Sequence, residues 1–263
     1  MIALYKYEWK SSMKSLIIWT LSVGIMGFVC ILLFKSMESN MADMAESFAS
    51  MGAFSEAFGM NTLSIASAKG FFATEIGTIH ALGGSMFAAS IATVILSKEE
   101  DGHTAEFTFT LPVSRWKVIV LKYLTVIFNI VVFTLVCGVM YKVGFMIIDA
   151  QGIGNEFIIY MLSQLLMSIE IASVCFLLSS VCKKNKLGIG IGIAMILYLY
   201  DLMARVIPDL KDYIFISPFS YANATEIFAE TADNATALII GVSVIVITTV
   251  LAGVIYSKRD LAS

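Results

Sequence analysis

The sequence has little charge for its length. Charged residues make up 14% of the 263 residues and hydrophobic residues 59%, whereas ordinary soluble domains carry about 25% charged residues. This composition is typical of an integral membrane protein. The net charge of -3 provides no basic surface of the kind that nucleic-acid-binding proteins carry, so we expect no nucleic-acid partner.

Several catalytic and cofactor motifs are also missing. G-x-x-x-x-G-K-[ST] does not occur, nor does another Gly-rich loop before a helix that could hold phosphates, so we do not expect this chain to hydrolyse nucleotide. HExxH and GxSxG are absent, and His80 and His103 are the only histidines. The four cysteines lie in or beside apolar runs and form no CxxC pair. The sequence therefore predicts a non-catalytic chain with no disulfide, metal or other cofactor of its own.

The apolar residues gather in six runs, each close to the roughly 20 residues that cross a bilayer as a helix. The runs cover residues 15–34, 74–97, 118–148, 157–182, 187–204 and 235–257. No A-x-A-like cleavage site follows the first run, which argues against a signal peptide. We predict an all-α integral membrane protein, one transmembrane domain over 1–263 with six transmembrane helices. Gly188 and Gly192 predict a close helix contact in the fifth run.

Two segments outside these runs are predicted to lie at the membrane surface. Residues 1–14 place apolar and lysine side chains on different faces at helical spacing, which predicts an interfacial amphipathic helix. Residues 205–234 mix prolines and charges with strongly apolar stretches. We expect this segment on the outer face, dipping partly into the bilayer, because irregular backbone at depth must be covered by protein or line a cavity.

The basic residues predict the orientation. Most of the 17 lysines and arginines fall in segments that lie on one side under the six-helix arrangement. By the positive-inside rule, that side is the cytoplasm and both termini are cytoplasmic, in the plasma (inner) membrane of a bacterium. Lys122 and Lys142 interrupt the third run, and we expect their side chains to extend toward opposite interfaces.

A carboxylate inside the fourth run is the best candidate for function within the membrane. Glu170 at mid-depth costs roughly 2.5–3.5 kcal/mol on insertion scales, so it is predicted to face the protein interior or water. Ser163 and Ser173 fall close to the same helical face and extend a polar stripe. This stripe is either a substrate path or the surroundings of a protonated Glu170 that hydrogen-bonds to a neighbouring helix. Asp201 and Arg205 are predicted to pair at i,i+4.

The polar segment 98–112 between the second and third runs combines charge with apolar area. A short helix is predicted near Asp101, ended by Pro112, and Ser114 is a suitable N-cap for the next helix. The candidate residues for contact with a partner are Glu99, Glu100, Asp101, Glu106, Phe107, Phe109 and Leu111. The alternative is an ordinary loop between two membrane helices.

Two motifs resemble a known family. Residues 99–106, followed by 111–115 and then Lys122, look like the cytoplasmic loop after the second span of ABC-2 type transporter permeases. Residues 216–221, Ile-Ser-Pro-Phe-Ser-Tyr, are similar to a motif in the outer segment of the same family. The resemblance implies the membrane subunit of an ABC exporter, in which two permease subunits, identical or different, associate with two ATPase subunits. It also implies that 98–112 holds the coupling helix that docks on the ATPase, and that ATP and Mg bind in that partner.

The sequence leaves the substrate and two other functions open. An apolar, weakly charged interior suits a drug, an antimicrobial peptide or a lipid, and Glu170 favours a cationic one. The first alternative function is an ion-coupled secondary transporter or channel in which Glu170, Asp201 and His80 form an ion relay. The second is a non-transporting membrane scaffold whose segment 98–117 recruits a soluble protein.

Overall fold

The computed structural model describes residues 2–102, 114–150, 153–232 and 235–259, with side chains from Tyr5 onward. Its helices are α1 (Ile2–Met37), η1 (Glu38–Asn40), α2 (Met41–Ala49), α3 (Ala53–Ala57), α4 (Ala68–Phe71), the π-helical turn η2 (Phe72–Ile76), α5 (Gly77–Val94), α6 (Lys98–Asp101), α8 (Arg115–Ile147), α9 (Asn155–Val181), α10 (Leu187–Val206), α11 (Pro208–Lys211), η3 (Ile214–Ile216), α12 (Ala224–Phe228) and α13 (Ala235–Lys258). Six helical stretches are long and apolar enough to cross a membrane. The predicted all-α fold with six transmembrane helices is confirmed.

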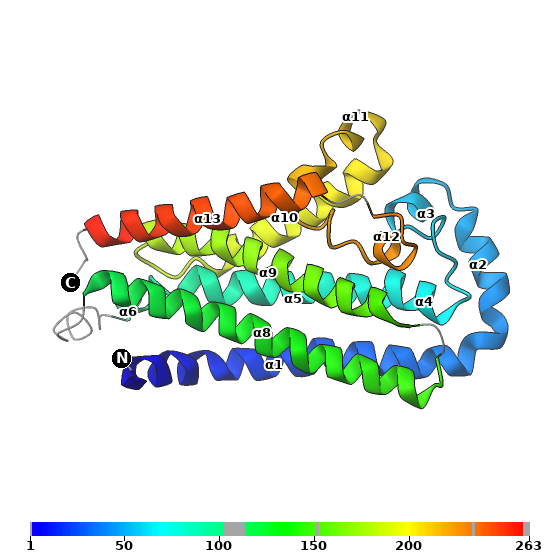
Figure 1. Ribbon diagram of the computed structural model, residues 1–263, viewed down its shortest axis with the longest axis horizontal. Helices are drawn as coiled ribbons and strands as arrows, with labels where there is room; N and C mark the ends of the chain where they lie inside the picture. The colour runs from blue at the N-terminus through cyan, green and yellow to red at the C-terminus, as the bar shows by residue number, and fades with distance from the viewer. Residues whose placement is uncertain (1, 103–113, 151–152, 233–234, 260–263) are drawn as a thin grey trace.

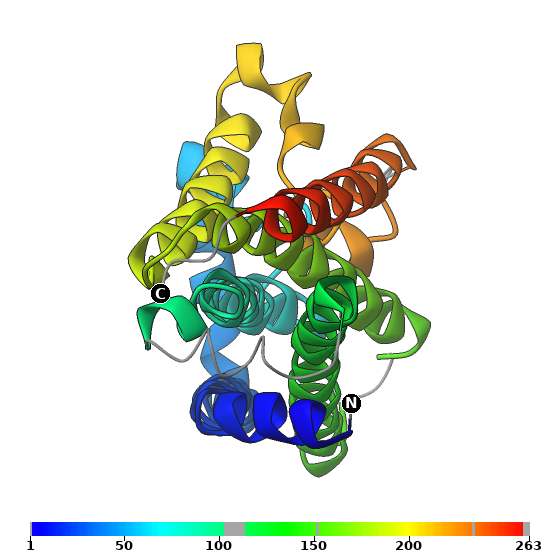
Figure 2. The ribbon, with the colours of Figure 1, turned by 90° about the vertical axis from the view of Figure 1, so that its left-hand side faces the viewer.

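The six long helices lie side by side along the long axis of the molecule (Figure 1). Helix α5 lies at the centre, in contact with α1, α8, α9 and α10 (Figure 2). Most of its residues are buried, whereas most of α13 at the edge is not. Both ends of the chain lie at one end of the bundle, and the short helices α2, α3, α4, α11 and α12 gather at the other (Figure 1). The central helix therefore runs between the end that carries both termini and the end that carries the short helices.

Helix α1 joins the predicted interfacial segment to the first span. It runs from Ile2 to Met37 without a break, because no proline or glycine occurs before Gly24 to end a helix near residue 14. Its first turns, dark blue in Figure 2, run sideways, whereas the rest of α1 is seen end-on. Lys6, Lys10 and Lys14 on these turns are exposed. The lysine face predicted for 1–14 thus lies on the outside of one bent helix.

Helices α5 and α10 approach each other closely at one glycine. A Cβ atom on Gly190 would lie 1.9 Å from Thr93 Oγ1 and 3.2 Å from the carbonyl oxygen of Ala89, so any side chain there would separate the helices. Gly188 and Gly192 meet no atom within 4 Å at their Cβ positions. The close contact predicted for these two glycines is wrong within this chain, because the helix turns Gly190 toward α5 instead.

The segment between α10 and α13 enters the bundle. Pro208 begins α11, where its missing N–H costs nothing, and the Asn223 side chain caps α12 by accepting the Glu226 N–H at 3.0 Å. Between these helices, Phe219 and Tyr221 are 4% and 1% exposed. The segment thereby brings an aromatic hydroxyl into contact with the transmembrane helices.

Candidate functional site

Four charged side chains meet at the end of the bundle that carries both termini, and we call them the ionic network: Glu8, Lys98, Glu99 and Lys122. Lys122 Nζ of α8 lies 2.9 Å from Glu8 Oε1 of α1 and forms an ion pair with Glu99 of α6. It also donates to the carbonyl oxygen of Ile95 at 2.7 Å. Lys98 Nζ lies 2.5 Å from Glu8 Oε2. The network joins α1, α6 and α8 to the end of α5.

Glu8, Glu99 and Lys122 of the ionic network are buried, Lys98 is partly exposed, and the four formal charges cancel. The Lys122 side chain has no exposed surface, and Glu8 is 1% exposed. Burial raises the pKa of Glu99, the Lys122 ammonium acts in the opposite direction, and the Glu8 carboxylate adds to the rise. Burial and the Glu8 carboxylate outweigh Lys122, so the pKa of Glu99 lies above its usual value. Removing one partner of such a pair is costly because it leaves the other charge buried.

A second group of contacts fixes the neighbouring ends of helices. Arg259, just beyond α13, forms an ion pair with Glu100 and donates to the carbonyl oxygens of Ser180 and Cys182 at 2.6 and 3.1 Å. Arg115, the first residue of α8, donates to the carbonyl oxygen of Arg259 at 2.9 Å. The ends of α6, α9 and α13 and the start of α8 are thereby held together.

The residues predicted to contact a partner fall into three groups: buried, exposed, and outside the described residues. Glu99 and Glu100 are 4% and 5% exposed and point into the protein, so their place on a docking surface is corrected: they anchor the segment instead of presenting it. Asp101 is exposed. Glu106, Phe107, Phe109 and Leu111 lie outside the described residues. Helix α8 begins at Arg115 after an extended Ser114, as predicted, although the Ser114 side chain makes no capping bond.

Glu170 lies in the bundle and accepts a hydrogen bond from the segment between α10 and α13. Tyr221 Oη donates to Glu170 Oε2 at 2.7 Å, and burial together with the carboxylate raises the pKa of Tyr221. A Cβ atom on Gly241 of α13 would lie 2.6 Å from Glu170 Oε2, so this glycine makes room for the carboxylate. Ser173 pairs with Tyr123 Oη at 2.7 Å. Glu170 and Ser173 of the predicted polar stripe thus bond to different tyrosines.

The remaining polar candidates also have partners of their own. Asp201 and Arg205 pair at 2.8 Å as predicted, and Arg205 also reaches Glu226 at 2.5 Å. His80 Nδ1 lies 3.1 Å from Tyr141 Oη. Glu170, Asp201 and His80 therefore bond to three different partners and do not form one hydrogen-bonded chain that could relay ions.

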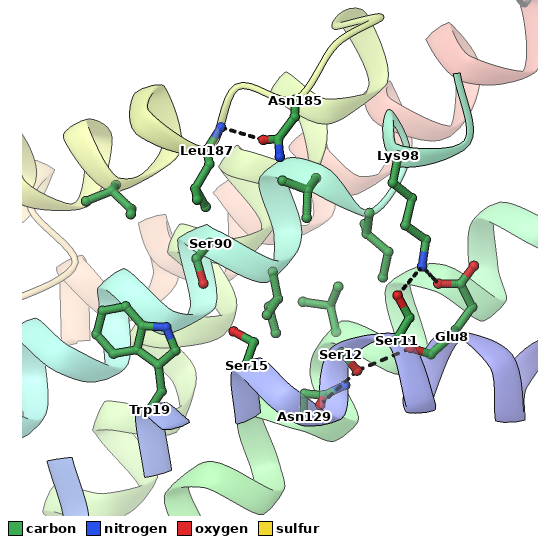
Figure 3. Close-up of a pocket in the computed structure, with 15 residues that line it drawn as sticks. Glu8, Ser11, Ser12, Ser15, Trp19, Ser90, Lys98, Asn129, Asn185 and Leu187 are labelled. Carbon is green, nitrogen blue, oxygen red and sulfur yellow. Dashed lines mark hydrogen bonds and ion pairs between the residues drawn. The ribbon is translucent and has the colours of Figure 1, made fainter. Parts of the chain in front are cut away.

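A cavity of about 280 Å³ lies beside the ionic network. It lies over α5, with α1 on one side and the start of α10 on the other (Figure 3). Its lining residues are Glu8, Ser11, Ser12, Ser15, Trp19, Ser90, Ile91, Val94, Ile95, Lys98, Val126, Asn129, Asn185, Leu187 and Ile191. Lys98 belongs to both the cavity wall and the ionic network, so the two are in direct contact.

These features define a helical membrane protein in which a short polar segment between the second and third spans is anchored by buried ion pairs. The model of a family described as ABC-2 family transporter protein matches residues 2–261. The chain belongs to this family, and it is a membrane transport subunit of the ABC permease type. A search of curated proteins found no match.

The sequence analysis did not predict the pairing of Glu8 and Lys122, the two central residues of the ionic network. Lys122 was expected to reach an interface, but its side chain is fully buried because Glu8 and Glu99 offer carboxylates at its own depth. The available signal was a lysine inside an apolar run and a single acidic residue among the lysines of the first fourteen residues. Opposite charges at one predicted membrane depth indicate a pair.

Replacing Lys122 with methionine should destabilise the protein strongly. Lys122→Met leaves the Glu8 and Glu99 carboxylates buried together, so we expect the free energy of unfolding to fall by about 3–5 kcal/mol. Lys117→Met, at an exposed position of the same helix, should change it by about 0.5 kcal/mol or less. Denaturant unfolding in detergent measures both. Equal stability of the two variants would contradict the energetic role of the network.

Proposed function

We propose that this chain is the membrane-spanning permease subunit of an ATP-driven ABC exporter that moves a hydrophobic or amphipathic substrate outward. The substrate class is a drug, an antimicrobial peptide or a lipid. The observation that carries the proposal is the anchoring of segment 98–112: its first residues are fixed to the bundle by buried ion pairs. A segment that passes force to membrane helices needs such a rigid attachment, whereas a loop that only connects two spans does not.

The ATPase partner docks on segment 98–112 in this proposal. Asp101 and the residues after it, including Glu106, Phe107, Phe109 and Leu111, contact the partner, and the buried Glu99 and Glu100 position them. Two ATPase subunits, each holding ATP and Mg, act on two permease subunits, identical or different. When the ATPases close on ATP, the segment moves and the ionic network carries that displacement to α1, α5 and α8.

The proposed orientation in the membrane rests on the lysines at the end of the bundle that carries both termini. Both termini and the ionic network lie at one end, and the lysines of the first turns and of the loop 183–186 lie outside the long apolar stretches. The positive-inside rule favours the cytoplasm for that end and the bacterial plasma membrane for the protein. The end that carries α2, α3, α11 and α12 then faces outward.

Within the bundle, Glu170 lies on the substrate path and favours cationic substrates. Ser163 lines a cavity at the outer end together with Tyr221 and Leu238, and Tyr221 Oη bonds to the carboxylate of Glu170. In this proposal, a substrate that moves between this cavity and Glu170 passes the Tyr221 hydroxyl group. The ion-relay alternative is weaker, because Glu170, His80 and Asp201 each bond to a different partner.

Changing the docking residues should separate the permease from its ATPase. We expect Glu106→Arg combined with Phe107→Ala to abolish co-purification with a co-expressed ABC ATPase, and to abolish the stimulation of ATP hydrolysis by the permease. Asn61→Arg, an exposed position at the opposite end of the bundle, serves as the control. If the double variant keeps both the complex and the stimulation, the docking assignment is wrong.

Neutralising Glu170 should change substrate preference. Glu170→Gln retains an acceptor for the Tyr221 hydroxyl but removes the charge, so ATP-driven transport of a cationic dye in proteoliposomes should fall about tenfold or more. Transport of a neutral amphiphile should fall much less. Tyr221→Phe is the matched control, since it removes the hydrogen bond and keeps the carboxylate. Equal losses for both substrates would assign Glu170 a purely structural role.

A further inference from the structure

The cavity beside the ionic network has a polar half whose groups donate hydrogen bonds. Figure 3 shows the Ser15 hydroxyl directed into the space between α1 and α5, and the Lys98 ammonium extending from α6 toward α1. Lys98 Nζ lies 3.4 Å from Ser11 Oγ as well as 2.5 Å from Glu8. The Lys98 side chain is 23% exposed and lines the cavity.

The carboxylate and side-chain amide oxygens in the same wall already accept hydrogen bonds. The two oxygens of Glu8 accept from Lys98 and Lys122, and Asn129 Oδ1 accepts from Ser12. Asn185 Oδ1 accepts the Leu187 N–H at 2.9 Å, which directs its amide NH₂ group to the other side. The polar half of the cavity therefore offers N–H and O–H groups to a ligand that brings acceptor oxygens.

The other half of the cavity is apolar, and the loop beside it is basic. Trp19, Ile91, Leu187 and Ile191 form this half, and the lysines of the loop 183–186 are exposed. A volume of about 280 Å³ is near the lower limit of roughly 300 Å³ for small-molecule pockets. A cavity of this size has room for a small polar headgroup and a few methylene groups, but not for a whole lipid.

We propose that this cavity binds the phosphate headgroup of a lipid from the adjoining leaflet. Phosphate oxygens accept from Lys98, Ser15 and the Asn185 amide, and the first methylenes of the chain lie against Trp19 and Ile191. Lys98 is also the first residue of α6, so an occupied cavity acts directly on the anchored start of segment 98–112. The link to ATP hydrolysis rests on the proposed function; the binding itself does not.

Lipid binding to the purified full-length chain, without ATPase or nucleotide, tests the site. The probe is a fluorescent short-chain phosphatidic acid, displaced by dioctanoyl phosphatidic acid, dioctanoylglycerol or inorganic phosphate. We expect the phosphatidic acid to displace the probe at a concentration at least about tenfold lower than dioctanoylglycerol, because charged hydrogen bonds are the strong ones. Inorganic phosphate should not compete. Displacement by phosphate alone would show a free-anion site, and equal potency of the two lipids would remove the headgroup claim.

Two variants locate the binding in this cavity. Asn185→Asp keeps the oxygen that caps Leu187 and places a negative charge at the cavity, so probe affinity should fall about tenfold or more. Asn61→Asp adds the same charge at the opposite end of the bundle and should leave affinity unchanged. Ser15→Phe fills the space from α1 and should abolish binding. Unchanged affinity in both Asn185→Asp and Ser15→Phe would overturn the proposal.

The failure of this inference is distinguishable from failure of the proposed function. If the ATPase complex forms and transports while the probe does not bind, the lipid site is wrong and the exporter function stands. If the probe binds and no ATPase complex forms, the lipid site stands without its link to ATP hydrolysis. In the intact complex, we expect dioctanoyl phosphatidic acid to raise ATP hydrolysis at least about twofold, and Asn185→Asp to abolish that rise. A rise that Asn185→Asp leaves unchanged would overturn the link.

Discussion

The Lys122 side chain has no surface exposed to solvent. Residues at the end of the bundle that carries both termini provide the acceptors for its ammonium group. Its partners come from three different elements: Glu8 from α1, Glu99 from α6 and the carbonyl of Ile95 after α5. Losing a partner of a buried charge is strongly destabilising, because the charge is then left unpaired. These elements are therefore expected to move together. That constraint turns the start of an otherwise short polar segment into a rigid part of the membrane domain.

Lys98 extends this arrangement to the cavity over α5. It shares Glu8 with Lys122 and also lines the cavity, so a ligand that draws on Lys98 competes with the ionic network for one ammonium. At the opposite end, Tyr221 of the segment between α10 and α13 lies inside the bundle and donates a hydrogen bond to Glu170. Polar contacts therefore connect both surface regions with the transmembrane helices, while α13 remains largely exposed for lipid or another subunit.

The sequence predicted the parts of the fold that depend on local pattern. Six bilayer-length apolar runs gave the six helices, and the i,i+4 spacing of Asp201 and Arg205 predicted their pair. The sequence did not predict pairs that form across helices, because Glu8 and Lys122 are far apart in the chain and their meeting depends on how α1 packs on α8. Of the candidate site, the short helix near Asp101 was predictable, but the inward direction of Glu99 and Glu100 was not.

The central claim is that the ionic network transmits movement between the ATPase and the membrane helices. Its most direct test is ATP hydrolysis by the complex that carries Glu8→Gln, which replaces one carboxylate of the network with a neutral amide of the same shape. The account predicts that this complex still assembles but loses most of the stimulation of ATP hydrolysis by the permease. Full stimulation in an assembled Glu8→Gln complex would contradict it.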